Sequence, residues 1–151
     1  MELKILDDRI AGLTYGSEGA AASDLRACTL DPTGARKALT EVIHLYPGHK
    51  VKIGCGFAIH LDENTCALLL PRSGLGTAGI RLANTVGLID ADYQGEVIAS
   101  IENQGNDVFN LEPLARIAQL VLVPFIRPRF EIVDDFTVAT KRGTGGFGST
   151  G

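Results

Sequence analysis

The sequence predicts an all-β, jelly-roll-like single domain with at most one short helix and a flexible, glycine-rich C-terminal tail. Three observations carry this prediction: many short apolar runs separated by turn residues, 18 glycines, and few patterns with the period of a helix. Short strands at regular spacing are typical of sandwiches and jelly rolls. At 151 residues the chain fits one domain with a buried core. We place its β domain at 1–139 and a mobile C-terminal arm at 140–151.

The clearest strand is expected at 51–61, where large or apolar residues at odd positions alternate with small or polar ones at even positions. This period of two is typical of a half-buried strand. Turn residues separate it from its neighbours, and only 73–79 has room for a short helix. The other strands are expected at 4–6, 39–45, 65–70, 97–103, 108–111, 117–125 and 130–133.

Composition argues against several classes of protein. The net charge of −4 gives no general attraction to nucleic acid or to an anionic membrane. No apolar run approaches the length of a membrane span, and the first residues lack the pattern of a signal peptide. We therefore expect a soluble, cytoplasmic protein without a nucleic-acid or membrane partner. The cysteines have no CxxC spacing and are expected to be reduced core residues, and the histidines are expected at the surface.

The segment 87–97 is the most informative one in the chain. It predicts a tight hairpin in which Asp92 begins a type I turn, Gly95 ends it, and a second strand follows. Asp90 ends an apolar run, where a carboxylate is costly unless a partner or a task keeps it there. Asp90 is therefore either an ordinary turn residue or a functional carboxylate, and the other motifs favour the second interpretation.

An anion site is predicted directly after the strand at 65–70. Arg72 offers a fork-shaped guanidinium, Ser73 a hydroxyl, and Gly74 a backbone that an anion can approach closely. The first turn of a short helix here would direct its amide groups the same way. An ordinary turn with a solvated arginine is the alternative.

The C-terminal arm has the composition of a second anion site. Arg142 is followed by five glycines between 143 and 151 and by the hydroxyls of Ser149 and Thr150. Phe147 stands alone among small residues, and a single aromatic ring is suited to stacking on a base. A disordered, solubilising end is the alternative. The Walker A pattern is absent from the sequence.

Two further positions carry weaker signals. Strict alternation in the strand at 117–125 places Gln119 on the face of Ile117 and Val121, opposite Arg116. Gln119 is then either a satisfied core glutamine or an amide that faces a ligand. Asp24 enters another expected strand, and by itself it indicates little.

In this order, five segments of the chain resemble the trimeric deoxyuridine triphosphatase (dUTPase) family. The segments are 24–27, 71–76, 87–97, 116–119 and 142–151. The resemblance implies a jelly-roll-like fold, a homotrimer with shared active sites, and Mg²⁺-dependent hydrolysis of dUTP to dUMP and pyrophosphate. This reaction keeps uracil out of DNA and supplies dUMP for thymidylate synthesis. Two departures from the family pattern are Ala22 in place of glycine and Leu114-Ala115 in place of Gly-Asp or Gly-Glu, the second of which we expect to alter a turn.

The resemblance also implies roles for single residues. Asp90 positions and deprotonates the water that attacks the α-phosphorus; because aspartate is a weak base, geometry and charge neutralisation supply most of the acceleration. Tyr93 packs on the deoxyribose and excludes a 2′-hydroxyl, while Asn84 and nearby backbone recognise uracil. Mg²⁺ binds mainly to the phosphates, with Asp24 touching it through water. The other substrate-binding residues are Arg72, Ser73, Gly74, Gln119, Arg142, Ser149 and Thr150 for the phosphates, Phe147 for the base, and Gly148 in the closing arm.

Two other functions stay open from the sequence. One is dCTP deamination on a similar trimer, although those enzymes use a glutamate base and lack this full tail. The other is a noncatalytic module that senses nucleotides, against which an intact Asp90 argues. The products formed from nucleotides distinguish the three: pyrophosphate, ammonia or nothing.

Overall fold

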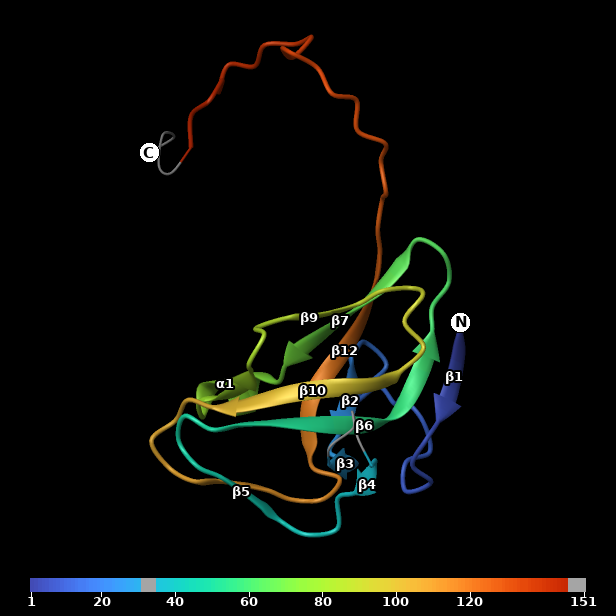
Figure 1. Ribbon diagram of the computed structural model, residues 1–151, viewed down its shortest axis with the longest axis vertical. Coiled ribbons are helices and arrows are strands. Elements are labelled where there is room, and N and C mark those ends of the chain that lie inside the picture. The colour runs from blue at the N-terminus through green and yellow to red at the C-terminus, as the bar shows by residue number, and fades with distance from the viewer. Residues whose placement is uncertain (31–34, 147–151) are drawn as a thin grey trace.

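The structure is a computed structural model and describes residues 1–30 and 35–146. Figure 1 shows a body of strands from which the C-terminal segment leaves as a single extended chain. The described residues form 12 strands and one short helix, which confirms the predicted fold class. The elements are β1 (Glu2–Ile5), β2 (Ser23–Arg26), β3 (Thr29–Leu30), β4 (Lys37–Ala38), β5 (Ile43–Leu45), β6 (Lys50–His60), β7 (Thr65–Pro71), α1 (Ser73–Thr77), β8 (Ile80–Leu82), β9 (Gly87–Ile89), β10 (Glu96–Asn103), β11 (Phe109–Leu111) and β12 (Arg116–Pro124).

Two antiparallel sheets make up most of the body. One has the strand order β4-β3-β6-β10-β8, with β1 also paired to β6, and the other has the order β2-β12-β7-β9. A separate pair joins β5 and β11. Both sheets contribute to one apolar core, in which Phe57 and Ile101 of the first meet Leu25, Leu69 and Leu120 of the second. Burial of these faces against each other stabilises the fold by about 1.5–3 kcal/mol per large side chain.

Strand β6 differs from its prediction. Alternating exposure is confined to its first residues, whereas every residue from Gly54 to Ile59 is buried. The reason is a cluster of charged side chains that covers the second face of the strand. Gly54 lies directly under Thr29 and Glu96, and Gly56 has a φ of +80°, a conformation that glycine adopts without strain.

The predicted hairpin at 87–97 is wrong. β9 pairs with β7, whereas β10 pairs with β6 and β8, so the segment crosses from one sheet to the other. β10 pairs with β6 along most of its length and with β8 at Ile101–Asn103, and none of its described pairings involves β9. The turn also begins two residues earlier than predicted, because the amide of Tyr93 donates to the carbonyl of Asp90 at 3.2 Å.

The strand predicted at 130–133 is also absent. The segment after β12 is extended, and Ile126, Phe130 and Ile132 are 89%, 88% and 99% exposed. A strand needs a neighbour to accept its backbone hydrogen bonds, and no other described segment lies beside this one (Figure 1). The division of the chain at residue 140 stays a prediction.

The remaining strand predictions differ from the structure mainly at their ends. The strand expected at 39–45 is shorter, and β8 was not predicted because it has only three residues. The three cysteines are free and buried, and the three histidines are exposed, which confirms both predictions. No helix in the described part of the chain is long and apolar enough to cross a membrane.

Candidate active site

Asp24 lies between two arginines on the outer face of the second sheet. The Nε of Arg72 donates to Asp24 Oδ1 at 2.8 Å, and the Nη1 of Arg116 donates to Asp24 Oδ2 at 3.1 Å. The three residues come from adjacent strands or strand ends, since β12 lies between β2 and β7. The carboxylate side chain is 27% exposed and that of Arg116 is 52% exposed, so this cluster opens to solvent. It can present guanidinium groups to an anion.

A bulge in β12 brings Gln119 to the same face. The pairing of β12 with β2 shifts between Arg116 and Ala118, and both Ile117 and Ala118 are buried in the core. Strict alternation is interrupted, so the prediction that Gln119 and Arg116 face opposite ways is wrong. Gln119 pairs with Asp24 across the ladder, and its Nε2 donates to the carbonyl of Pro71 at 2.9 Å. The half-buried amide therefore supports the strand end from which Arg72 leaves.

The residues after Arg72 leave open space next to this cluster. Ser73 and Gly74 begin α1, and both are exposed. No atom lies within 4 Å of the position that a Cβ at Gly74 would take. An anion held by Arg72 would thus meet a hydroxyl and an uncovered backbone, as the sequence predicted for this kind of site.

A second group of predicted site residues surrounds a small cavity at the end of β9. The cavity has a volume of about 200 Å³ and is lined by Asp90 and Tyr93 together with apolar side chains of β9 and β10. Asp90 is exposed. The Tyr93 hydroxyl donates to the carbonyl of Glu96 at 2.8 Å, and Gly95 leaves room for it because a Cβ there would overlap this hydroxyl. Asn84 is exposed and lies close to Gly87 at the start of the same strand.

One chain does not bring the two groups together. Ile89 pairs with Ala67 across β9 and β7, and Arg72 lies five residues beyond Ala67. At the rise of a strand this places the Asp90 end of β9 about 17 Å from Arg72. Arg142 belongs to neither group: it lies in the arm, where its Nε donates to the carbonyl of Gly145 at 2.8 Å (Figure 1). Phe147, Gly148, Ser149 and Thr150 lie outside the described residues.

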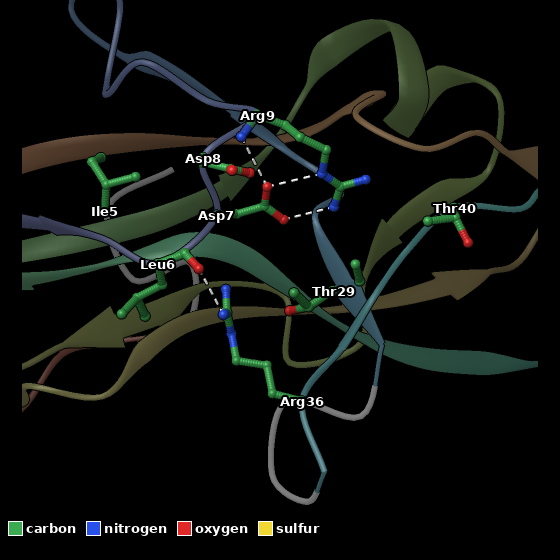
Figure 2. A pocket seen from close by; sticks show the side chains of 9 residues that line it. Ile5, Leu6, Asp7, Asp8, Arg9, Thr29, Arg36 and Thr40 are labelled. Carbon is green, nitrogen blue, oxygen red and sulfur yellow. Dashed lines mark hydrogen bonds and ion pairs between the residues drawn. The ribbon is translucent and has the colours of Figure 1, made fainter.

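A largely buried cluster of charges that the sequence analysis missed lines a cavity with a volume of about 680 Å³. Figure 2 shows that Arg9 donates hydrogen bonds to the Asp7 carboxylate and that Arg36 donates one to the carbonyl of Leu6. Hydrogen bonds from Arg9 lower the pKa of Asp7, and those to Glu96 raise the pKa of Arg36. The feature of the sequence that could have indicated this cluster is the pair of glycines at 54 and 56 inside an apolar strand.

These residues could hold a divalent cation only together with a bound ligand that supplies further oxygen atoms. Among the described residues, no three His, Cys, Asp or Glu side chains converge as a metal cage would require. Mg²⁺ keeps several waters and is usually held by one or two carboxylates together with phosphate oxygens. Asp24 is the carboxylate of the cluster with Arg72 and Arg116, and its place beside Arg72 is compatible with contact to a cation through water.

Comparison with known proteins identifies the family of the chain. The dUTPase family model matches residues 37–151. Deoxyuridine 5′-triphosphate nucleotidohydrolase from Azoarcus sp. (strain BH72) is 49% identical, with 100% of this chain and 97% of the relative covered. The same enzyme from Methylobacillus flagellatus is 50% identical over 100% of this chain and 96% of the relative. The solved dUTPase of Staphylococcus bacteriophage 80alpha with dUPNHPP superimposes with a TM-score of 0.80 at 25% identity, over 99% of this chain and 97% of that one.

The described residues thus form an antiparallel β sandwich in which two arginines hold an aspartate near the strand ends. The chain belongs to the dUTPase family.

Proposed function

We propose that this protein hydrolyses dUTP to dUMP and pyrophosphate by attack of water on the α-phosphorus, which keeps uracil out of DNA and supplies dUMP for thymidylate synthesis. Full-length identity of about half to named dUTP nucleotidohydrolases carries this proposal. A cytoplasmic location and the absence of nucleic-acid and membrane partners are part of it.

The phosphate chain is assigned to the Asp24 cluster. Arg72 and Arg116 supply guanidinium groups whose planar fork matches phosphate oxygens. Gln119 acts with them from the same face, and Ser73 and Gly74 add a hydroxyl and an open backbone. Arg116 was not among the predicted binding residues, and its contact with Asp24 supports adding it.

The nucleoside and the attacking water are assigned to the segment that follows β9. Tyr93 packs on the deoxyribose, and Asn84 with neighbouring backbone reads the uracil edge. The exposed carboxylate of Asp90 orients the water and accepts its proton. Because an aspartate is a weak base, positioning of the water and neutralisation of the phosphates supply most of the acceleration.

Mg²⁺ is the proposed cofactor. When bound, it neutralises charge on the phosphate oxygens of the substrate. Asp24 would contact the ion through water. Its carboxylate accepts the hydrogen bond from Arg72 Nε, which fixes the direction of this guanidinium.

The separation within one chain supports a homotrimer with shared sites. Arg72 and the Asp90 end of β9 are about 17 Å apart along β7, a distance that leaves water on Asp90 out of reach of phosphates held at Arg72. A neighbouring chain can bring the missing half. The arm of a further chain then closes the site, with Arg142, Ser149 and Thr150 on the far phosphates, Phe147 on the base and Gly148 giving the close approach.

The direct test is an assay of the purified protein with dUTP, dCTP, dTTP and UTP. We expect pyrophosphate and dUMP from dUTP and little reaction with the other three. A merely permissive apolar pocket would discriminate a methyl group by only about 1–3 kcal/mol. Ammonia released from dCTP would instead identify a deaminase, and comparable kcat/KM values for dTTP or UTP would contradict the assigned base and sugar contacts.

Co-expression tests the shared sites. Chains with Asp90→Asn and chains that end after Thr140, each inactive alone, are combined in equal amounts. If the segment 87–97 and the arm of one site come from different chains, about a quarter of the sites are intact after random assembly. Mixed trimers shown by mass spectrometry but with background turnover only would refute the sharing. The truncated chain alone is expected to keep the wild-type melting temperature, since the arm adds almost nothing to the core.

A further inference from the structure

Glu96 is a buried carboxylate with more partners than a strand residue ordinarily has. Its Oε1 accepts the Thr29 hydroxyl at 3.0 Å and the Gly56 amide at 2.8 Å. Its Oε2 accepts the Arg36 Nε at 2.6 Å, and Arg36 Nη2 approaches Oε1 at 3.3 Å. The side chain of Glu96 is 6% exposed. Hydrogen bonds from a guanidinium, a hydroxyl and a backbone amide therefore fix the position of this carboxylate from several directions.

The backbone around Glu96 is shaped to admit it. A side chain at Gly54 would collide with both Thr29 and Glu96, and Gly56 has positive φ. The pairing of β10 with β6 shifts between Glu96 and Ile98, so regular pairing is given up at this residue. Both β6 and β10 therefore depart from regular strand geometry at the place where the Glu96 carboxylate is buried. A side chain that only filled space would not require these departures.

The same residue is bonded to the predicted sugar-contacting side chain at its other end. The carbonyl of Glu96 accepts the Tyr93 hydroxyl at 2.8 Å. Gly95, between them, has no side chain that would block this bond. Glu96 thus joins the buried charges behind the sheet to Tyr93 and to the cavity that Asp90 lines.

We infer that Glu96 is a positioning residue for catalysis: its buried carboxylate fixes the backbone that holds the Tyr93 ring, and so sets the discrimination between dUTP and UTP. The inference rests on the proposed function, in which Tyr93 excludes a 2′-hydroxyl. It adds Arg36 and Thr29 as residues that act on selectivity without touching the substrate.

Asp7 supplies a matched control. It is buried to a similar degree, with a side chain 6% exposed, and pairs with Arg9 at 2.6 Å in the cavity that Arg36 and Thr29 also line (Figure 2). Asp7 makes no hydrogen bond to any described residue between Asp90 and Glu96. Asp7→Asn therefore removes a comparable buried charge without acting on Tyr93.

The experiment compares kcat/KM for dUTP and for UTP in the wild type, Glu96→Gln and Asp7→Asn, with the melting temperature of each. Glutamine keeps the size of Glu96 but turns an amide donor toward Arg36. Because small displacements of a positioning group have large effects on rate, we expect the dUTP/UTP ratio to fall about tenfold in Glu96→Gln. In Asp7→Asn the ratio should stay within about twofold of the wild type, although the protein is less stable.

In a Tyr93→Phe background, Glu96→Gln should change the dUTP/UTP ratio little further, because the effects of residues that act through one contact are not additive.

An unchanged ratio in Glu96→Gln, or an equal fall in Asp7→Asn, would overturn the inference and leave Glu96 as a stabilising residue only. Should Glu96→Gln not fold, Arg36→Lys replaces it, since a lysine keeps the charge but loses the two-nitrogen contact; the expected fall is about threefold. Failure of the proposed function is seen separately, because the wild type would then not prefer dUTP at all.

Discussion

Asp24 and Asp90 are both exposed enough to contact a ligand, yet their carboxylates differ in their hydrogen-bond partners. Each oxygen of Asp24 accepts a hydrogen bond from an arginine. Asp90 directly follows β9, and no described side chain donates to its carboxylate. An aspartate that accepts hydrogen bonds from two guanidinium groups fixes the direction of those groups. An aspartate without such partners can orient a water and accept its proton, so the surroundings of the two carboxylates favour different tasks.

Replacing the free carboxylate should have the largest effect on turnover. In Asp90→Asn the shape is kept and the base is removed, so we expect kcat for dUTP to fall by roughly 10²-fold or more while binding persists. Single-turnover kinetics and the Kd of a nonhydrolysable dUTP analogue measure the two quantities. Asp92→Asn is the control two residues away, and equal losses from both variants would show that the wrong aspartate was assigned.

Replacing the held carboxylate should have a smaller effect of another kind. Asp24→Asn leaves Arg72 and Arg116 without their common anionic partner, and the arginines lose their fixed direction. We expect KM for dUTP to rise about tenfold, in keeping with the loss of one charge-assisted hydrogen bond at a partly exposed site. A loss confined to kcat, with KM unchanged, would contradict this positioning role.

A third carboxylate, that of Asp7, is buried and paired with Arg9. Replacing it should change the free energy of unfolding and leave turnover unchanged. Because Arg9 lowers its pKa in the folded protein, Asp7 contributes stability that is fully present above the ordinary aspartate pKa of about 3.8. This contribution is lost as the pH falls below that value, through the lowered pKa of the folded state. Wild type should therefore exceed Asp7→Asn by about 1–3 kcal/mol in urea unfolding at pH 7. The difference should shrink below pH 4, and a constant difference would exclude the linkage.

The smallest expected effect concerns the turn that leads to Arg116. Leu114 has a φ of +59°, and its carbonyl accepts the Arg26 Nη1 at 2.9 Å. A left-handed conformation costs a residue with a side chain about 1–2 kcal/mol, whereas glycine adopts it freely. Leu114→Gly should raise the free energy of unfolding by about 0.5–1 kcal/mol without changing kcat/KM. Leu114→Ala retains the strain, so an equal gain there would assign the effect to the lost leucine side chain.

Periodicity and turn residues were enough to predict the fold class and most strands, because apolar alternation reports which faces are buried. They could not show pairing. The segment at 87–97 has the composition of a hairpin, yet β9 pairs with β7 and β10 pairs with β6 and β8, and only the three-dimensional arrangement reveals this. The apolar run at 130–133 likewise has the composition of a strand but no described partner within the chain.

The candidate site was predictable in residue type but not in geometry. The motif residues were chosen from the sequence, and Asp24, Arg72 and Gln119 do lie together. Arg116 was not predicted as a site residue. Strict alternation placed it on the face opposite Gln119, and a one-residue bulge reverses that placement. The Glu96 network was invisible because its members, Thr29, Arg36 and Gly56, are far apart in the sequence.

The buried thiols have a practical consequence for the chemistry of the protein. Burial raises the pKa of Cys28 to about 11 and moves that of Cys55 upward as well. Only the thiolate attacks alkylating reagents and peroxides readily, and at neutral pH these two side chains are almost entirely protonated as well as inaccessible. Treatment of the folded protein with iodoacetamide should therefore leave Cys28 and Cys55 unmodified, and both should become reactive when the sandwich unfolds. Their labelling is a direct chemical report of unfolding in a chain that contains no tryptophan.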